Sequence, residues 1–197
     1  MARPQEFEVN DVLDHAMEVF WHKGFDDTSI QDLVDATGLN RGSLYNAFGD
    51  KAHLFADVMD RYRAHSLARL LATAPDDASP RQLILDFLQG LVDRARCDTD
   101  HKGCLITNTA AGLYGCNEHM STWIRQTLIS LEDVLSNVIE RGQQRGEITR
   151  QSSPRALARY LVSAAQGINV MARAKPCQDT LRDIVTNTMR ALEPQSS

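Results

Sequence analysis

Apolar residues recur at three- and four-residue spacing along almost the whole chain, which is the period of one face of an α-helix. The alternating pattern of strands is nearly absent, and there are no Asn-Gly or Asp-Gly pairs of the kind that form hairpin turns. The sequence therefore predicts an all-α protein of about nine helices.

The first two helices are defined by their apolar faces and by residues suited to helix ends. Asn10 is a candidate N-cap for the first helix, and Gly24 is a candidate glycine at its C-terminal end. Thr28 and Gln31 fit a capping box that would start the second helix. The apolar residues that share one face of the first helix are Val9, Val12, Leu13, Ala16, Met17 and Phe20, and the positions expected to face inward in the second are Ile30, Leu33 and Val34.

A sharp turn is expected between the second and third helices. Gly38 adopts a left-handed backbone at little cost, and Asn40 can cap the third helix. The residues expected to face the core are Leu44, Ala47 and Phe48, and those left outside are Arg41, Gly42, Ser43, Tyr45 and Asn46. Two short helices joined by such a turn form the helix-turn-helix that reads the DNA major groove.

The side chains of this outer face have the chemistry of DNA readers. The Arg41 guanidinium can bind a guanine edge or a phosphate, and the Asn46 amide and Ser43 hydroxyl can pair with base edges. Tyr45 can bond a phosphate or pack its ring on a thymine methyl group, while Gly42 lets the backbone come close. An ordinary helical hairpin with a polar face would have the same periodicity, so periodicity alone leaves both interpretations open.

Phosphate contacts are expected at the starts of neighbouring helices. Thr28, Ser29 and Lys51 stand there, where backbone N–H groups and the helix dipole favour an anion. The chain has a formal charge of −5, and residues 1–63 hold six basic side chains against twelve acidic ones. DNA affinity must therefore come from a small cationic patch that dimerisation doubles, and non-specific binding should be weak.

The stretch from about Val9 to Tyr62 closely resembles the N-terminal domain of TetR-family transcriptional regulators. The matching residues are Gly24-Phe25, Thr28-Ser29-Ile30, Ala36-Thr37-Gly38-Leu39, Arg41-Gly42-Ser43-Leu44-Tyr45-Asn46-Ala47-Phe48 and Lys51-Ala52-His53-Leu54. Val34 departs from the family pattern, which commonly has alanine where the two helices cross.

The resemblance implies an all-α homodimer that binds a palindromic double-stranded DNA operator. It implies a DNA-binding domain over residues 1–53 and a ligand-binding and dimerisation domain over residues 54–197. The positions that match the family's DNA contacts are Thr28, Arg41, Ser43, Tyr45, Asn46 and Lys51.

The rest of the chain also has helical periodicity. The fourth helix includes Leu54 and is expected to continue to about Ala72. Later helices are expected at about Pro80–Arg96, Cys104–Tyr114, Met120–Gln144, Pro154–Arg173 and Gln178–Leu192, with Gly142 and Gly146 unwinding the 120–144 helix. The resemblance implies that the last two helices form a four-helix dimer interface; the alternative is that they cover only their own protomer's core.

Two His-Cys pairs have the spacing of a zinc site. His101 and Cys104 are followed by Cys116 and His119. A continuous helix between the pairs would hold the cysteines about 18 Å apart, which disfavours both a zinc site and a Cys104–Cys116 disulfide. We therefore expect no metal and no cofactor.

The cysteines are expected to be free thiols, although a Cys97–Cys104 disulfide stays open. Cys104 begins a helix beside His101 and Lys102, an environment that lowers the pKa of a thiol and favours reaction with oxidants or electrophiles. The alternative is that Cys104 is a small buried apolar residue, and the same two interpretations apply to Cys177.

An inducer pocket is expected between the fifth and the eighth expected helices, from about Pro80–Arg96 to Pro154–Arg173. The side chains of the apolar and polar types that such a pocket uses are Phe87, Leu91, Cys104, Asn108, Tyr114, Trp123, Leu128 and Gln166. Each is also compatible with an ordinary core or surface position.

The sequence thus predicts a cytoplasmic, ligand-responsive repressor that is not an enzyme and has no membrane segment. A thiol-dependent enzyme built on Cys104 with His101 or His119 is one alternative, although an oxyanion loop and a third orienting group are missing from the sequence pattern. A helical adaptor without DNA function is another.

Overall fold

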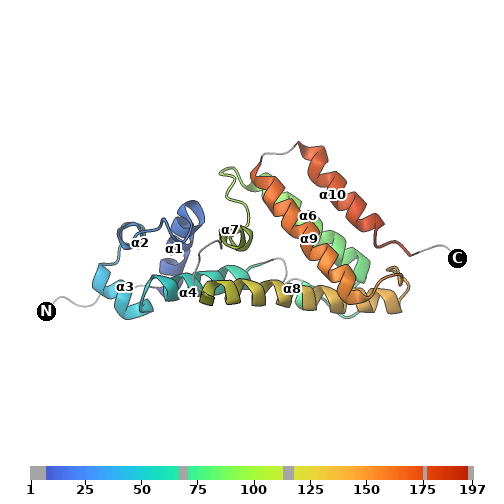
Figure 1. The fold of residues 1–197 in the computed structure, drawn as a ribbon, viewed down its shortest axis with the longest axis horizontal. Coiled ribbons are helices and arrows are strands. Elements are labelled where there is room, and N and C mark those ends of the chain that lie inside the picture. Colours follow the sequence, from blue (N-terminus) through green and yellow to red (C-terminus); the bar gives the residue numbers. More distant parts are fainter. Residues whose placement is uncertain (1–7, 67–70, 113–117, 175–176, 195–197) are drawn as a thin grey trace. The chain divides into compact units, whose positions relative to one another are not determined.

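The described part of the chain is helical throughout. The computed structural model describes residues 8–66, 71–112, 118–174 and 177–194, and in these ranges it has nine α-helices and no strand. The expected all-α class is confirmed (Figure 1). The chain divides into two compact units, Met1–His65 and Ser66–Ser197. Among the described helices, none is long and apolar enough to span a membrane.

The first unit contains four helices. They are α1 (Val9–Lys23), α2 (Ile30–Thr37), α3 (Arg41–Phe48) and α4 (Lys51–Ala64). α1 packs against both α2 and α4, and the shorter α3 contacts α2 and α4. The side chains of Phe20, Leu33, Leu54 and Met59 are at most 1% exposed and form the centre of this unit.

Aromatic rings join α1 to α4. The Phe20 and Phe55 rings meet edge to face with centroids 4.7 Å apart, and the Phe25 ring lies 5.2 Å from that of Phe55. Trp21 and Tyr62 form a second edge-to-face pair at 5.1 Å. Such pairs contribute about 0.5–1.5 kcal/mol beyond the burial of their area. These contacts fix the position of the loop between α1 and α2.

An arginine on α4 binds polar side chains of α1. Arg61 donates two hydrogen bonds of 2.6 Å to the Asp14 carboxylate and one of 2.7 Å to Asn10 Oδ1. The Arg61 hydrogen bond is the main reason why the pKa of Asp14 lies below its usual value. The prediction that Asn10 caps α1 is wrong, because Glu8 is the N-cap residue.

The end of α4 also differs from the prediction. α4 ends at Ala64, and the His65 N–H bonds the Tyr62 carbonyl. A single helix running to Ala72 is therefore wrong. α4 belongs to the first compact unit, whose end at His65 lies beyond the 53/54 boundary expected from the resemblance. The division of roles at that boundary stays a prediction.

The second unit contains five helices in the described ranges. They are α6 (Pro80–Cys97), α7 (Leu105–Ala111), α8 (Glu118–Gln144), α9 (Pro154–Arg173) and α10 (Gln178–Arg190). Pro80 and Pro154 are the first residues of α6 and α9, where the missing N–H costs nothing because no residue of the helix would accept its hydrogen bond. Ser79 and Ser153 are the N-cap residues of these two helices. α8 and α9 form the most extensive helix pair, and α6 packs against α8, α9 and α10.

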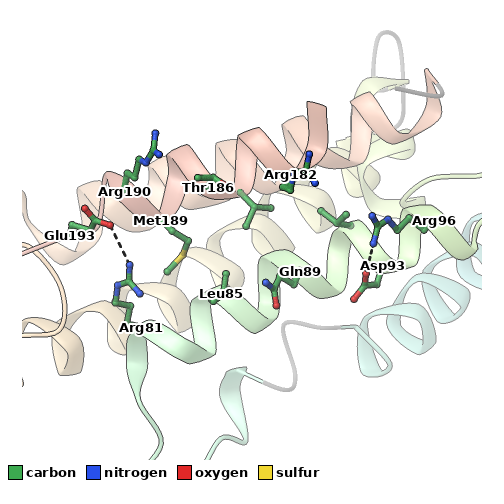
Figure 2. A pocket seen from close by; sticks show the side chains of 12 residues that line it. Arg81, Leu85, Gln89, Asp93, Arg96, Arg182, Thr186, Met189, Arg190 and Glu193 are labelled. Carbon is green, nitrogen blue, oxygen red and sulfur yellow. Dashed lines mark ion pairs between the residues drawn. The ribbon is translucent and has the colours of Figure 1, made fainter. Parts of the chain in front are cut away.

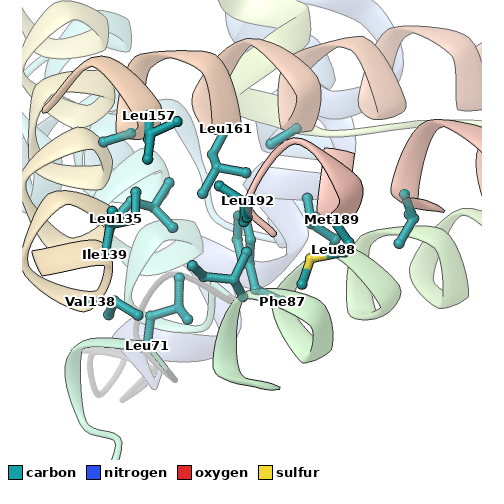
Figure 3. Packing of buried hydrophobic residues seen from close by; sticks show 14 of the residues in the cluster. Leu71, Phe87, Leu88, Leu135, Val138, Ile139, Leu157, Leu161, Met189 and Leu192 are labelled. Atoms are coloured by element: carbon teal, nitrogen blue, oxygen red, sulfur yellow. The ribbon is translucent and has the colours of Figure 1, made fainter. Parts of the chain in front are cut away.

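The core of this unit lies where α6, α8, α9 and α10 meet. Figure 3 shows side chains of all four helices converging there. The side chains that are essentially inaccessible to solvent include Ile84, Leu88, Leu135, Ile139, Leu161 and Ile168. Gly142 lies inside α8 and does not unwind it as predicted, because the helix continues to Gln144. A side chain at Gly142 would collide with Ile148, so the glycine permits close packing.

Candidate nucleic-acid interface

The start of α2 is fixed by a capping box. Ser29 is the N-cap, its hydroxyl accepts the Asp32 N–H at 3.1 Å, and the Asp32 carboxylate accepts the Ser29 N–H at 2.9 Å. The predicted box of Thr28 and Gln31 is wrong by one residue. The Thr28 side chain is 1% exposed and donates its hydroxyl to the Gly24 carbonyl at 2.6 Å, so it is not available as a cap.

Asp32 also binds a cation from α1. The Lys23 ammonium donates a hydrogen bond of 2.6 Å to Asp32. This bond, followed by the bonds from the Ser29 backbone and hydroxyl, lowers the pKa of Asp32 to about 2. The N-terminus of α2 is therefore tied to the last turn of α1. Sequence reasoning missed Lys23 because the nine-residue separation follows no helical period.

The turn between α2 and α3 has the predicted geometry. Gly38 has φ 69° and ψ 4°, the left-handed conformation in which a β-carbon would be strained. Asn40 caps α3, its side chain accepting the Ser43 N–H at 2.9 Å. A β-carbon at Gly42 would lie 3.3 Å from the capping oxygen of Asn40, so Gly42 protects this cap. The predictions for Gly38 and Asn40 are confirmed.

The two faces of α3 differ in chemistry. Leu44 and Phe48, four residues apart, are buried at 3% and 8% exposure. Ala47 is exposed, so the prediction that it faces the core is wrong. The outer residues are the exposed Arg41, Gly42 and Asn46 and the half-buried Ser43 and Tyr45. The structure thus places on one short helix the five residues expected on the DNA-facing side, four of which have side chains that can contact bases and one of which, Gly42, allows close approach of the backbone.

The cation of this face is available for a ligand. The Arg41 guanidinium lies 5.6 Å from the centre of the Tyr45 ring, within the range of a cation–π contact. In the described part of the chain, no carboxylate lies within ion-pair distance of Arg41. A guanidinium supported by a ring and not neutralised by an acid can bind a phosphate or a guanine edge.

Lys51 is engaged within the protein. Its ammonium donates hydrogen bonds of 2.8 Å to the carbonyl oxygens of both Phe25 and Thr28, and a longer one of 3.4 Å to that of Asp26. Its side chain is half-buried, whereas the adjacent N-cap residue Asp50 is exposed. The phosphate contact expected at Lys51 stays a prediction. Because its ammonium already bonds protein carbonyls, its backbone N–H is the group better placed to bind a phosphate.

The residues expected to line an inducer pocket lie on several helices of the second unit. Phe87 and Leu91 are buried on the inner face of α6, and Trp123 and Leu128 are half-buried on α8. Cys104 is the N-cap residue of α7. Tyr114 lies outside the described residues.

A polar bridge joins α7 to α9 near these residues. The buried Thr107 hydroxyl donates to Gln166 Oε1 at 2.6 Å and accepts from Asn169 Nδ2 at 3.3 Å. Asn108 accepts a bond of 3.2 Å from Arg173. The structure therefore brings two predicted residues, Asn108 and Gln166, into neighbouring contacts. Thr107, Asn169 and Arg173 were not predicted, although Asn169 lies one helical turn after Gln166.

The cysteines are free thiols where the structure describes them. Cys97 and Cys177 are exposed and Cys104 is half-buried, so the Cys97–Cys104 disulfide is not formed. The Thr180 hydroxyl, as donor to the sulfur, lowers the pKa of the Cys177 thiol. Cys116 lies outside the described residues, and so does the side chain of His119. The described residues contain no cluster of metal-ligating side chains.

Two family profiles cover most of the chain. The profile described as "Bacterial regulatory proteins, tetR family" matches residues 12–58. The profile described as "Tetracyclin repressor-like, C-terminal domain" matches residues 80–188, which is more than half of the chain. The matches lie in the two compact units separately.

Known proteins resemble the chain over nearly its full length. The HTH-type transcriptional regulator YezE of Bacillus subtilis is 29% identical over 194 residues, covering 98% of this chain and 100% of YezE. The HTH-type transcriptional repressor ComR of Escherichia coli is 29% identical over 190 residues, which cover 96% of this chain and 90% of ComR.

Solved structures share the fold. A cysteine-substituted variant of the TetR-family regulator CifR, in complex with a 26-base-pair operator DNA, superposes with a TM-score of 0.83 at 25% identity, covering 97% of this chain and 100% of CifR. The reduced form of Escherichia coli NemR superposes with a TM-score of 0.85 at 19% identity, covering 95% of this chain and 98% of NemR. This likeness shows that the two proteins share a fold. The chain therefore belongs to the tetR family of bacterial regulatory proteins and is a DNA-binding transcriptional regulator.

Proposed function

We propose that the protein is a homodimeric repressor that places α3 of each subunit in the major groove of a palindromic operator. The observation that carries the proposal is the outer face of α3, where Arg41 and Asn46 are exposed and no acid of the described residues pairs with Arg41. In helix-turn-helix dimers, the two recognition helices enter successive major grooves about one helical turn of DNA apart. The operator complexes of CifR support this arrangement by relationship.

The proposed DNA contacts fall into two groups. Base contacts come from Arg41, Ser43, Tyr45 and Asn46, with Gly42 allowing close approach of the backbone. Phosphate contacts come from helix N-termini, through the backbone N–H groups near Thr28, Ser29 and Lys51, since the Ser29 hydroxyl itself donates to the Asp32 carboxylate at 2.8 Å. The Thr28 hydroxyl and the Lys51 ammonium already bond protein carbonyls, so they hold the interface in shape and contribute less directly.

We infer that the dimer forms through α9 and α10. Three large apolar side chains on α9 remain exposed in the single chain, namely Tyr160 at 43%, Val170 at 55% and Met171 at 38%. Ser163 and Gly167 lie between them at helical spacing and allow another helix to approach closely. A stripe of this kind is typical of a surface that a second copy covers.

Release is proposed to follow ligand binding beside the bridge between α7 and α9. The Thr107–Gln166 hydrogen bond connects α7 to the helix that carries the proposed dimer face. A small molecule that competes for these polar groups would move α7 relative to α9 and shift the population of DNA-binding dimers. Modification of Cys104, at the N-terminus of α7, would act on the same helix.

Selection from random DNA duplexes tests this function. Purified protein is incubated with a random library, bound duplexes are amplified, and the enriched sequences are read. The proposal predicts a palindromic consensus with two half-sites about one helical turn apart. Absence of any enriched sequence would favour a helical adaptor without DNA function. Turnover of generic thioesters that depends on Cys104 would favour the enzyme alternative.

A further inference from the structure

A groove runs between α6 and α10 on the outside of the second unit. It has a volume of about 600 Å³, within the range of small-molecule sites. Figure 2 shows side chains of both helices lining it along their length. Its floor is apolar, formed by Leu85 and Val92 of α6 and by Val185 and Met189 of α10.

This groove is separate from the interior position expected for the inducer. Leu85, Gln89 and Val92 follow one another at three- and four-residue spacing, so they share one face of α6. Phe87 and Leu91 are each two residues from a groove residue, which places them about 200° around the helix. Both are buried in the core. α6 therefore presents its inner face to the core and its outer face to the groove.

The apolar floor is only partly covered by the protein itself. Val185 and Met189 are 7% and 6% exposed, because α10 packs them against its neighbours. Leu85 and Val92 on α6 are half-buried and face the open side. A bound apolar group would remove this remaining surface from water, which favours binding.

The rim of the groove is positively charged. Four arginines line it, Arg81, Arg96, Arg182 and Arg190, against the two carboxylates of Asp93 and Glu193. The lining thus has an excess of two positive charges in a chain whose formal charge is −5. The occupant that complements this lining has a negatively charged group and an apolar body.

The existing ion pairs of the rim can be exchanged. Arg81 lies 3.6 Å from Glu193, and Arg96 lies 3.7 Å from Asp93 within its own helix (Figure 2). Arg182 pairs with Asp179 one turn earlier on α10. The side chains of these arginines are between 38% and 69% exposed, and ion pairs this exposed contribute little stability because water screens them. A carboxylate held between two guanidiniums at the edge of an apolar floor gains more from each arginine.

We propose that the groove between α6 and α10 binds an amphipathic carboxylate, with its carboxylate on Arg96 and Arg182 and its hydrocarbon chain along Val92, Val185 and Leu85. Arg96 lies in the last turn of α6 and Arg182 in the second turn of α10, and Figure 2 shows both toward the same end of the groove. This site goes beyond the proposed repressor function, because it lies outside the interior pocket and needs no DNA.

Titration calorimetry with dodecanoate tests the proposal. The wild type is expected to bind dodecanoate more tightly than dodecanol or dodecyltrimethylammonium, which share the chain but lack the carboxylate. In the Arg96→Ala/Arg182→Ala variant, dodecanoate affinity should fall at least tenfold. The matched control is Arg63→Ala/Arg125→Ala, which removes two exposed arginines outside the groove, one of them also paired with an aspartate one turn away. This control should bind as the wild type does.

A second variant blocks the floor without changing charge. Gln89 is exposed in the middle of the groove, so Gln89→Trp would cover the apolar floor and should also weaken dodecanoate binding at least fivefold. Wild-type affinity in both groove variants would place the anion elsewhere and overturn the proposal, as would equal binding of the cationic amphiphile. Self-association beyond a dimer that Gln89→Trp abolishes would identify a second copy as the occupant instead. The assay contains no DNA, so its failure is distinct from failure of the repressor function.

Discussion

The ammonium group of Lys51 lies 4.5 Å from the centre of the Phe25 ring and donates a hydrogen bond of 2.8 Å to the carbonyl oxygen of the same residue. A second bond of 2.8 Å reaches the Thr28 carbonyl, immediately before the N-cap of α2. The first residue of α4 therefore holds the loop from which α2 starts. Lys51 is a positioning residue for the helix-turn-helix in this structure.

Replacing Lys51 with methionine separates this role from a phosphate contact. Lys51→Met should destabilise the protein by about 1–3 kcal/mol, because two short hydrogen bonds to a charged group are lost. It should also weaken operator binding, since α2 and α3 lose their support. The slope of log affinity against log salt should stay unchanged, whereas Arg41→Ala should reduce it by about 1 for each lost contact. A reduced slope in Lys51→Met would instead assign its ammonium to a DNA phosphate.

Stability in acid should depend on Asp32. Its pKa is lowered from 3.8 to about 2 by Lys23 and Ser29, so the carboxylate stabilises the folded state fully above pH 3.8. This stabilisation is lost as the pH falls from 3.8 through about 2, because protonation removes the ion pair and the capping interaction. Melting temperatures measured by circular dichroism between about pH 5 and pH 2 should therefore fall less steeply in Asp32→Asn than in the wild type. Asp57→Asn, an exposed acid on α4, is the matched control and should follow the wild type.

The proposed dimer face can be tested with a matched pair of substitutions. Val170 on α9 and Ile129 on α8 are both exposed apolar residues, at 55% and 48%. Val170→Glu should dissociate the dimer, because the interface would then bury an unpaired charge. Ile129→Glu should leave the dimer intact. Sedimentation velocity reports both, and a dimeric Val170→Glu protein would exclude α9 as the main contact.

The thiol at the start of α7 gives a separate prediction. If Cys104 senses oxidants or electrophiles, N-ethylmaleimide or peroxide should release wild-type protein from its operator, and Cys104→Ser should resist release. Cys177→Ser is the control for a competing thiol, because the Thr180 hydroxyl favours the Cys177 thiolate. Indifference of the wild type to both reagents would end the thiol hypothesis.

Helices with strong local end signals could be predicted closely from the sequence. α9 has the expected bounds of Pro154 and Arg173, since Ser153 and Pro154 encode its start. The end of α4 could not be predicted, because apolar spacing continues through Leu67 and Leu71 although the helix stops at Ala64. Periodicity counts apolar positions and does not record where a helix ends.

The candidate site could be predicted as a set of residues but not as a set of contacts. The exposure of Arg41 and Asn46 follows from helical spacing alone. Two adjacent hydroxyls, Thr28 and Ser29, are equally good caps in the sequence, and only the burial of Thr28 decides between them. The bonds of Lys51 span more than twenty residues, so they depend on tertiary packing that no local pattern contains.

The central claim is that the outer face of α3 reads DNA, and the affinity of Arg41→Ala and Tyr45→Ala for the selected duplex tests it most directly. Each variant is measured by gel shift at a fixed salt concentration, with sedimentation velocity to verify the dimer. Both side chains lie outside the core, so folding and dimerisation should be retained. The account predicts that each substitution abolishes specific binding. Wild-type affinity in both variants, with the dimer intact, would contradict it.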